Sequence, residues 1–290
     1  MLVGLEQLRE DLHDLSPAAD LHLHSVYSDG TFTPDQLAAI GRELGFVALA
    51  LTDHDTVEGC SEMAQACNAL GLQFIPGVEL TTEFNNREIH VLGYFIDPTH
   101  TDLNDLLLTC QLARRERVKR IVHKLHQINV PLKGELVFEI AQCNSPGRPH
   151  IARALVRSGF ASNYEEAFEK YLKKGRPAWV PKLKVGTAEA IELVHAAGGL
   201  AFLAHPGISN VEDCLDTLIR MGFDGIECFH SKHSPEQSER YTQVAISRGL
   251  LISGGSDCHG YNKDKPLIGG VRLPMRYVNA IVHRHAGKPR

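Results

Sequence analysis

The chain has 290 residues, 43% of them hydrophobic, and a formal net charge of −5 at pH 7. This length can bury a full α/β core, and the mild negative charge excludes a protein that coats nucleic acid by charge alone. Seven cysteines without a Cys-x-x-Cys pair exclude a disulfide framework and a zinc finger, so we expect buried thiols in a reducing compartment. The N-terminal segment lacks the apolar stretch of a signal peptide, and no run of 18 apolar residues occurs; we therefore expect a cytoplasmic protein that does not enter a membrane.

The first predicted strand carries two histidines on one face. In residues 20–25 (DLHLHS), successive side chains of an extended chain point to opposite sides, so His22 and His24 share one side and the two leucines share the other. Asp29 follows close behind. Two imidazoles so placed form a convergent pair of nitrogen ligands.

A helix is predicted next, over residues 33–45. Thr33 is a favourable N-cap, Pro34 suits the first helical position, and Gly45 is a typical stop. Short apolar runs alternate with such helical stretches over this part of the chain, which predicts parallel βα units.

Later segments repeat the pattern of an apolar strand that ends in polar side chains. In the last of these segments, side chains alternate between the two sides of the strand, so Asp257 and His259 share one side and Cys258 points to the other. Barrels and open α/β folds place their active sites at such C-terminal strand ends. The segments are residues 49–55, 74–79, 88–94, 200–207, 225–230 and 251–259.

The pattern divides the chain into three parts. Residues 1–97 and 187–290 show βα alternation, whereas residues 98–186 read as helices without a convincing strand. We expect these helices to be an insertion that caps the active-site face. Within them, residues 106–128 form a long amphipathic segment whose basic side chains we interpret as a solvated helix face rather than a nucleic-acid contact: Arg114, Arg115, Arg117, Lys119 and Arg120.

Taken together, the polar motifs resemble the PHP (polymerase and histidinol phosphatase) metallophosphoesterase superfamily. The motifs that carry the resemblance, in chain order, are His22-x-His24, Thr52-Asp53-His54, Glu79, His90, His205-Pro206 and Asp257-x-His259. Residues 147–152 (GRPHIA) and the stretch 168–181 are similar to a stand-alone branch that includes RNase AM and nucleoside 3′,5′-bisphosphate phosphatases. The resemblance implies a distorted (β/α)7 barrel with a helical insertion, and up to three divalent metal ions per chain.

The resemblance also implies which residues hold the metals. His22, His24 and Asp257 would hold the first ion, and Glu79 would bridge it to the second. The remaining ligands would be His90 and His205 for the second ion, and Asp29, His54 and His259 for the third. These nitrogen and oxygen donors suit Mn²⁺, Fe²⁺ or Zn²⁺ and disfavour copper(I) or an iron–sulfur cluster. Asp20 and Asp53 are expected to orient ligand histidines through hydrogen bonds.

Other residues are assigned to the substrate or to the scaffold. Arg148 and His150 are expected to contact a substrate phosphate, with Arg148 as a bidentate clamp. For His230 a substrate contact and a packing role stay open. We expect a structural role for His195 and a surface position for four further histidines: His123, His126, His283 and His285.

The expected activity is hydrolysis of phosphomonoesters of small nucleotides by a hydroxide that bridges two metal ions and attacks phosphorus. The first substrate choice is the 3′-phosphate of nucleoside 3′,5′-bisphosphates, and the second is short oligonucleotides degraded from 5′ to 3′. The chain has no nucleophile motif of the Gly-x-Ser-x-Gly type. The general acid, the native metal and the oligomeric state stay open. No long duplex nucleic acid is expected as a partner.

Three alternatives are weighed against this activity. A histidinol-phosphate phosphatase, or another small-molecule phosphatase, would use the same chemistry. An amidohydrolase-type enzyme would place a lysine at a strand end of the site, and none is found there. A non-catalytic PHP module would be expected to lack ligands, whereas all nine positions are filled.

Overall fold

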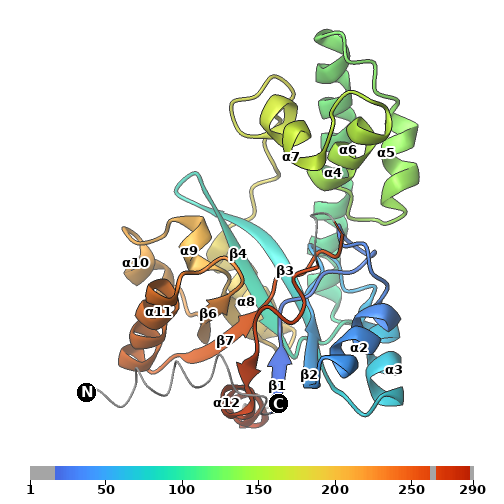
Figure 1. Cartoon of the computed structure of the whole chain (residues 1–290). Coiled ribbons are helices and arrows are strands. Elements are labelled where there is room, and N and C mark those ends of the chain that lie inside the picture. Colours follow the sequence, from blue (N-terminus) through green and yellow to red (C-terminus); the bar gives the residue numbers. More distant parts are fainter. Residues whose placement is uncertain (1–16, 262–265, 288–290) are drawn as a thin grey trace.

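The computed structural model of the chain describes residues 17–261 and 266–287. The expectation that the N-terminus lacks a signal peptide concerns residues 1–16 and lies outside them. No helix in the described ranges combines the length and the apolar surface needed to cross a membrane. Figure 1 shows a barrel in the lower part of the molecule and a helical lobe above it.

The barrel is built on one eight-stranded sheet in the order β7-β6-β5-β4-β3-β2-β1-β8. The chain beyond β1 closes it against the end of β7: Leu21 N donates to Gly254 O at 3.2 Å, and Asp257 N donates to His22 O at 2.9 Å. The predicted α/β barrel is thereby confirmed. The strands are β1 (Ala18–Asp20), β2 (Phe46–Leu51), β3 (Gln73–Phe84), β4 (Arg87–Tyr94), β5 (Leu200–Leu203), β6 (Gly225–His230), β7 (Leu251–Gly255) and β8 (Leu273–Pro274).

Helices pack around the barrel, with α2 and α3 on one side and α9 to α11 on the other (Figure 1). The predicted capping of the first of them is confirmed, because Thr33 and Gln36 form a reciprocal capping box and Gly45 has a φ of +77°. The helices of the barrel are α2 (Pro34–Glu43), α3 (Cys60–Ala69), α8 (Thr187–Ala196), α9 (Pro206–Ser209), α10 (Leu215–Ile219), α11 (Pro235–Arg248) and α12 (Met275–Ala286).

Two strands of the sheet depart from the predicted parallel direction, the short β8, which is antiparallel to β1, and β4. β4 is antiparallel to both β3 and β5, because β3 and β4 form a hairpin instead of a βα unit. Only Asn85 and Asn86 connect them, both with positive φ (51° and 61°), as a two-residue type I′ turn requires. A crossover to a parallel strand needs a dozen or more residues, so this connection can only reverse the chain.

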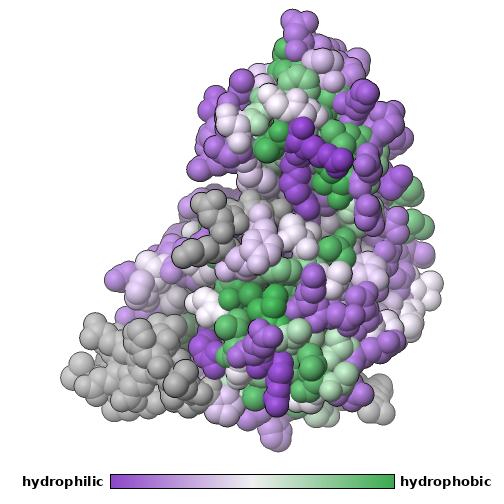
Figure 2. All heavy atoms as spheres, turned by 45° about the vertical axis from the view of Figure 1, so that its right-hand side comes forward, coloured by the Kyte–Doolittle hydropathy of each residue, from purple (hydrophilic) through white to green (hydrophobic). Residues whose placement is uncertain are grey.

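The helical lobe lies between β4 and β5, in the stretch where the sequence predicts an insertion. It has its own hydrophobic core, and Figure 2 shows it as the narrower upper part of the molecule, covered mainly by hydrophilic side chains. Its elements are α4 (Thr101–Gln127), α5 (Gly134–Ala141), α6 (Arg148–Arg157), α7 (Tyr164–Ala167) and a π-helical turn, η1 (Phe168–Leu172).

Helix α4 belongs to both parts of the molecule. Leu103 and Leu107, near its start, pack in the barrel core, whereas Val118 and Leu125, near its end, pack in the core of the lobe. One continuous helix of 27 residues therefore joins the lobe to the barrel.

The interpretation of the basic residues of α4 as a solvated face is wrong for two of them. Arg115, Lys119 and Arg120 are exposed, but Arg117 is only 7% exposed and Arg114 is largely buried. Residues 178–186, which follow the lobe in the sequence, return over this face of the helix; Val180 O, for example, accepts a hydrogen bond from Arg117.

We predict that Gly255→Ala destabilises the barrel at its point of closure. A Cβ on Gly255 would lie 2.3 Å from the backbone nitrogen of His22, so one of the two strands would have to move. The expected cost is about 2–3 kcal/mol, or a Tm lower by roughly 5–10 °C in a thermal melt. The control is Gly134→Ala at the start of α5, where the nearest atom is 3.9 Å away. Equal melting temperatures of the two variants would contradict the prediction.

Candidate metal centre

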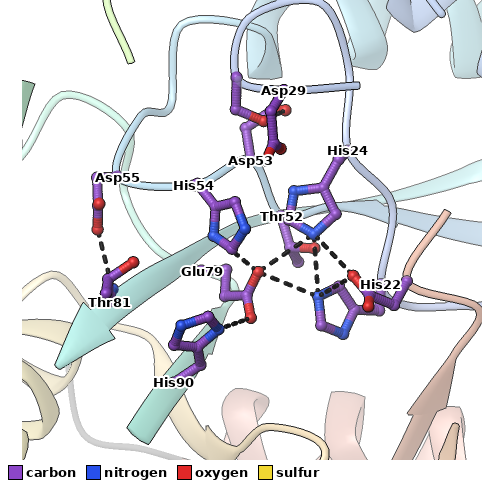
Figure 3. A network of polar contacts seen from close by, with 12 residues as sticks. His22, His24, Asp29, Thr52, Asp53, His54, Asp55, Glu79, Thr81 and His90 are labelled. Carbon is purple, nitrogen blue, oxygen red and sulfur yellow. Dashed lines mark hydrogen bonds and ion pairs between the residues drawn. The ribbon is translucent and has the colours of Figure 1, made fainter. Parts of the chain in front are cut away.

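Polar side chains from six strands and their following loops meet at one end of the barrel, and Figure 3 shows a part of this group. His22 and His24 come from the segment after β1, and Glu79 and His90 come from the β3–β4 hairpin. The group is withdrawn from solvent, since His22, His24 and Glu79 are each 0% exposed. The other members follow β2, β5 and β7 or lie in the loop after β1: Asp29, His54, His205, Asp257 and His259.

Four of these side chains bring one donor atom each within 4.8 Å of one another. His22 Nε2 and His24 Nε2 face each other at 3.1 Å. Glu79 Oε2 lies 3.3 and 3.2 Å from these two nitrogens, and Asp257 Oδ1 lies 3.5 and 3.3 Å from them. Ligands at ~2.0–2.1 Å from a tetrahedral ion are separated by about 3.3–3.4 Å, so the four atoms fit one divalent cation.

Glu79 turns its two carboxylate oxygens toward different histidines. Oε2 faces the pair just described and also His54 Nδ1 at 2.9 Å. Oε1 lies 2.6 Å from His90 Nδ1 and 3.0 Å from His205 Nε2. A carboxylate in this position can bridge two ions, one on each side.

A third group gathers around the ring of His24. His259 stacks on this ring with centroids 4.0 Å apart, and the ring of His54 lies 4.6 Å from it. His259 Nε2 is 3.2 Å from Asp29 Oδ1. One donor atom from each of His24, Asp29, His54 and His259 lies within 4.8 Å of the others, as binding of one ion by these residues requires.

Charge in this centre is balanced by the histidines. Burial raises the pKa of Glu79, but His54 and His90 outweigh it and hold this pKa well below its usual range. Burial lowers the pKa of His24, yet hydrogen bonds to Asp257 and Glu79 raise it overall to about 10. At His54 burial prevails and lowers the pKa to about 4. A divalent cation needs neutral imidazoles and would compete with the protons on His22 and His24.

Asp20 and Asp53 contact the backbone and serine hydroxyls, not the ligand rings they were expected to orient. Asp20 Oδ1 accepts from the backbone nitrogens of His22 (3.3 Å) and Ser256 (2.9 Å), so it fixes the two segments that close the barrel. Asp53 accepts from the backbone nitrogen of Ser25 at 2.7 Å and from two hydroxyls, of Ser25 (2.6 Å) and Ser28 (2.5 Å). Both carboxylates shape the loops that carry the histidines.

Glu227 orients the ring of His22, a role that was not predicted from the sequence. Its Oε1 lies 2.8 Å from His22 Nδ1, and its Oε2 accepts from His205 N at 2.7 Å. This contact turns Nε2 of His22 toward the other ligand atoms. An acidic residue between Ile226 and Cys228, inside an otherwise apolar strand, was the available signal.

Of the predicted substrate contacts, only His230 reaches this centre. Its Nε2 lies 3.3 Å from Asp257 Oδ2. His150 is 1% exposed and accepts a hydrogen bond from Gly147 N at 3.0 Å, which makes it part of the cap of α6. Arg148 lies in the lobe, with its guanidinium 5.8 Å from the centre of the Phe168 ring.

His195 and the four histidines expected at the surface lie apart from the centre. His195 bonds Asp224 at 2.7 Å, and His285, expected at the surface, stacks on Phe95. His123, His126 and His283 are exposed.

Asp55 links the centre to the lobe. This residue directly follows His54, and Arg114 of α4 binds its carboxylate through Nε at 2.7 Å. Asp55 also accepts from the backbone nitrogen of Thr81 at 2.9 Å, the contact drawn in Figure 3. The ion pair fixes α4 next to the strand that carries Glu79.

Comparisons with known proteins agree with these observations. A family model described as "PHP domain" matches residues 20–178. The chain is 34% identical over 247 residues to "5′-3′ exoribonuclease Rnm" of Escherichia coli, covering 83% of this chain and 84% of that protein. It is 31% identical over 266 residues to "3′,5′-nucleoside bisphosphate phosphatase" of Chromobacterium violaceum, covering 86% and 93%. A crystal structure from Bifidobacterium adolescentis, described as a metal-dependent phosphoesterase, superposes with a TM-score of 0.86 at 33% identity and covers 93% of this chain and 96% of that chain.

We predict that Glu227→Gln weakens metal binding without removing a ligand. Loss of the charge behind His22 leaves its ring less basic and less firmly oriented, and such changes typically cost 10- to 100-fold in metal affinity. The measurement is a titration of the metal-free protein with Zn²⁺ against a competing chelator. Glu192→Gln, on the exposed face of α8, is the matched control. Identical affinities for the two variants would show that Glu227 does not support the site.

Proposed function

The chain belongs to the PHP domain family of metal-dependent phosphoesterases, and from this membership and the metal centre we propose that it hydrolyses phosphoesters of small nucleotides. Its first proposed substrates are nucleoside 3′,5′-bisphosphates, which would lose the 3′-phosphate. The observation that carries the proposal is the convergence of donor atoms from His22, His24, Glu79 and Asp257, with the second oxygen of Glu79 turned toward other histidines.

We assign up to three divalent ions, Mn²⁺, Fe²⁺ or Zn²⁺, to the three groups of ligands. His22, His24 and Asp257 would hold the first, His90 and His205 the second, and Asp29, His54 and His259 the third, with Glu79 between the first two. Bound divalent ions lower the pKa of a water molecule and neutralise charge on phosphoryl oxygens. The protein's own part is to hold these donors in a site that excludes bulk water.

Lys232 is an exposed cation beside one of the predicted ligands. Its Nζ lies 3.6 Å from Asp257 Oδ2, while the side chain is 45% exposed. An ammonium in this position would meet the phosphate group as it approaches the ligands from solvent. His230, buried behind Asp257, would hold that carboxylate in place through its 3.3 Å contact.

A second proposed activity is the degradation of short oligonucleotides from the 5′ end. It is supported by the 34% identity to a protein named as a 5′-3′ exoribonuclease, which is slightly higher than the identity to the bisphosphate phosphatase. Both activities would break the bond between phosphorus and O3′, so one centre can serve both.

The test is release of phosphate or mononucleotide after reconstitution with Mn²⁺, Fe²⁺ or Zn²⁺. The panel consists of adenosine 3′,5′-bisphosphate, adenosine 3′- and 5′-monophosphates, a 5′-phosphorylated tetraribonucleotide and histidinol phosphate. We expect the highest kcat/KM for the bisphosphate, with adenosine 5′-monophosphate as product. A preference for histidinol phosphate, or no turnover of any nucleotide with any of the metals, would refute the proposal.

We predict that Glu79→Gln loses both metal and activity. The amide keeps the shape of the side chain but removes the charge that two ions would share. Loss of about 3 kcal/mol of transition-state stabilisation corresponds to at least about 100-fold in kcat. Elemental analysis of the purified variant should show fewer ions per chain, while Glu192→Gln retains the wild-type content. Wild-type metal content with wild-type turnover in Glu79→Gln would rule out the bridging role.

We predict that two neighbouring ligands serve different ions. Asp257→Asn should weaken the first ion, because its Oδ1 lies within 3.5 Å of both His22 and His24. His259→Asn should mainly weaken the third ion, since this ring faces Asp29. Stepwise titration of each metal-free variant with Mn²⁺ should show the loss of different binding steps. The same step missing in both would argue against the division.

A further inference from the structure

The helical lobe contacts the barrel at two loops that carry predicted ligands of the third ion. Asp29 lies in the loop after β1, and His54 lies in the loop after β2 (Figure 3). The part of the lobe that meets these loops is the turn between α5 and α6 together with the first half of α6, residues 142–153. We call these residues the docking segment.

Two side chains of the docking segment bond to the backbone of the ligand residues themselves. Ser145 Oγ donates to His54 O at 2.6 Å, and Arg153 Nη2 donates to Asp29 O at 3.0 Å. Ser145 is 0% exposed, so its hydroxyl is not readily replaced by solvent. Each bond limits where the attached ligand side chain can lie.

Two further contacts lie next to the ligands. Cys143 Sγ donates to Ser28 O at 3.2 Å, directly before Asp29 in the sequence. Asn144 Nδ2 donates to Glu58 Oε1 at 2.9 Å, in the loop after β2. One short piece of the lobe therefore bonds to both loops.

The docking segment is held in shape by its own helix ends. Gln142 ends α5 in the left-handed region, with a φ of 48°, and its N–H donates to Phe138 O at 3.1 Å. Gly147 N donates to His150 Nδ1 at 3.0 Å, at the start of α6. Because both ends of the turn are fixed, Ser145 reaches the barrel as part of a rigid unit.

The backbone that follows His54 also depends on contacts from a lobe helix. Asp55 has a φ of 51°, a conformation that is uncommon for residues other than glycine and persists only where its surroundings hold it. Two side chains of α4 do so: Gln111 Nε2 donates to Asp55 O at 3.1 Å, and Arg114 Nε donates to the Asp55 carboxylate at 2.7 Å. His54 is thus fixed from the lobe at its own carbonyl and at the next residue.

The ligands of the first ion are supported differently. The ring of His22 is oriented by Glu227 of β6, and His22 O accepts from Asp257 N at 2.9 Å where the sheet closes. These contacts lie within the barrel. Loosening of the docking segment should therefore change the third group of ligands and leave the first group intact.

We propose that Ser145 and Arg153 are positioning residues for the third metal ion, and that binding of this ion in turn holds the lobe on the barrel. The proposal rests on the proposed function, because it uses the third group of ligands named there. Two binding events that are linked in this way strengthen each other by the same factor. A protein without the third ion would keep the other ions and have a more loosely docked lobe.

The first experiment is a calorimetric titration of the metal-free protein with Mn²⁺, in which the third step is the one that His259→Asn removes. Ser145→Ala and Arg153→Gln should each weaken this step by roughly 10-fold and leave the other steps unchanged. Ser158→Ala and Arg157→Gln, exposed at the end of the same helix, are the matched controls. A wild-type protein without a third step, an unchanged third step in both variants, or equal weakening of every step would overturn the proposal.

A conservative variant separates positioning from folding. Arg153→Lys keeps a cationic donor for the carbonyl of Asp29, so its affinity in the third step should lie between those of the wild type and Arg153→Gln. Thermal melts of the metal-free variants show how far each substitution affects the fold. Affinities that follow these melting temperatures, rather than the donor present, would contradict the positioning role.

The second experiment follows the lobe itself, by hydrogen exchange of the backbone amides of residues 142–153. Saturation of the wild-type protein with Mn²⁺ should slow this exchange by roughly 10-fold relative to the metal-free protein. In His259→Asn, which lacks a ligand on the barrel side, Mn²⁺ should leave the exchange rate unchanged. A contact with a structural role alone would exchange equally fast with and without metal, and that result would refute the link.

Neither experiment contains a nucleotide, so their outcome is independent of turnover. A third step that depends on Ser145 and Arg153, in a protein that hydrolyses no nucleotide, would refute the proposed function and support the positioning role. Hydrolysis of nucleotides by a protein whose docking segment does not respond to metal would support the function and refute the positioning role.

Discussion

Glu79 carries a negative charge into a part of the barrel from which water is excluded, and the imidazoles of five histidines surround it. These five histidines come from four separate segments of the chain, so the carboxylate can keep its charge only when the barrel is closed. The positions of the loops follow from this requirement. Asp20 and Asp53 hold the backbone of the segments that deliver His22 and His24, and Glu227 holds the ring of His22. The buried charge and the closed sheet therefore depend on each other.

The reversal of β4 extends this arrangement beyond the barrel. A parallel strand would offer its polar side chains only at its end, whereas the antiparallel hairpin presents His90 from within β4, opposite Thr81. The hairpin continues past the barrel rim, so Glu83 and Glu88 lie beside the lysines that follow the lobe. One reversal thus supplies ligands to the metal centre and two carboxylates to the ion pairs with these lysines.

Much of the metal centre could be predicted from the sequence, because successive side chains of a strand point to opposite faces. This rule depends only on residues that are neighbours in the sequence. It placed His22 with His24 and Asp257 with His259 on common faces, and the structure brings both pairs together. The same rule cannot predict contacts between segments that are far apart in the sequence. The periodicity of α4 suggested a solvated basic face, since nothing local reveals that residues 178–186 return to cover Arg117. The role of Glu227 could not be predicted for the same reason, because its partner, the ring of His22, lies 205 residues earlier in the sequence.

The shared helix α4 gives the molecule a mechanical property. Its first three turns are fixed in the barrel core and its last turns in the core of the lobe, so the helix acts as a rigid lever between them. From Cys110 to its end the lever is about 25 Å long, and a tilt of about 5° at its base would displace its tip by about 2 Å. Arg117 lies about 10 Å from Cys110 and would move by less than half as much as the tip. A tilt of α4 would therefore displace the far end of the lobe more than it displaces Arg117.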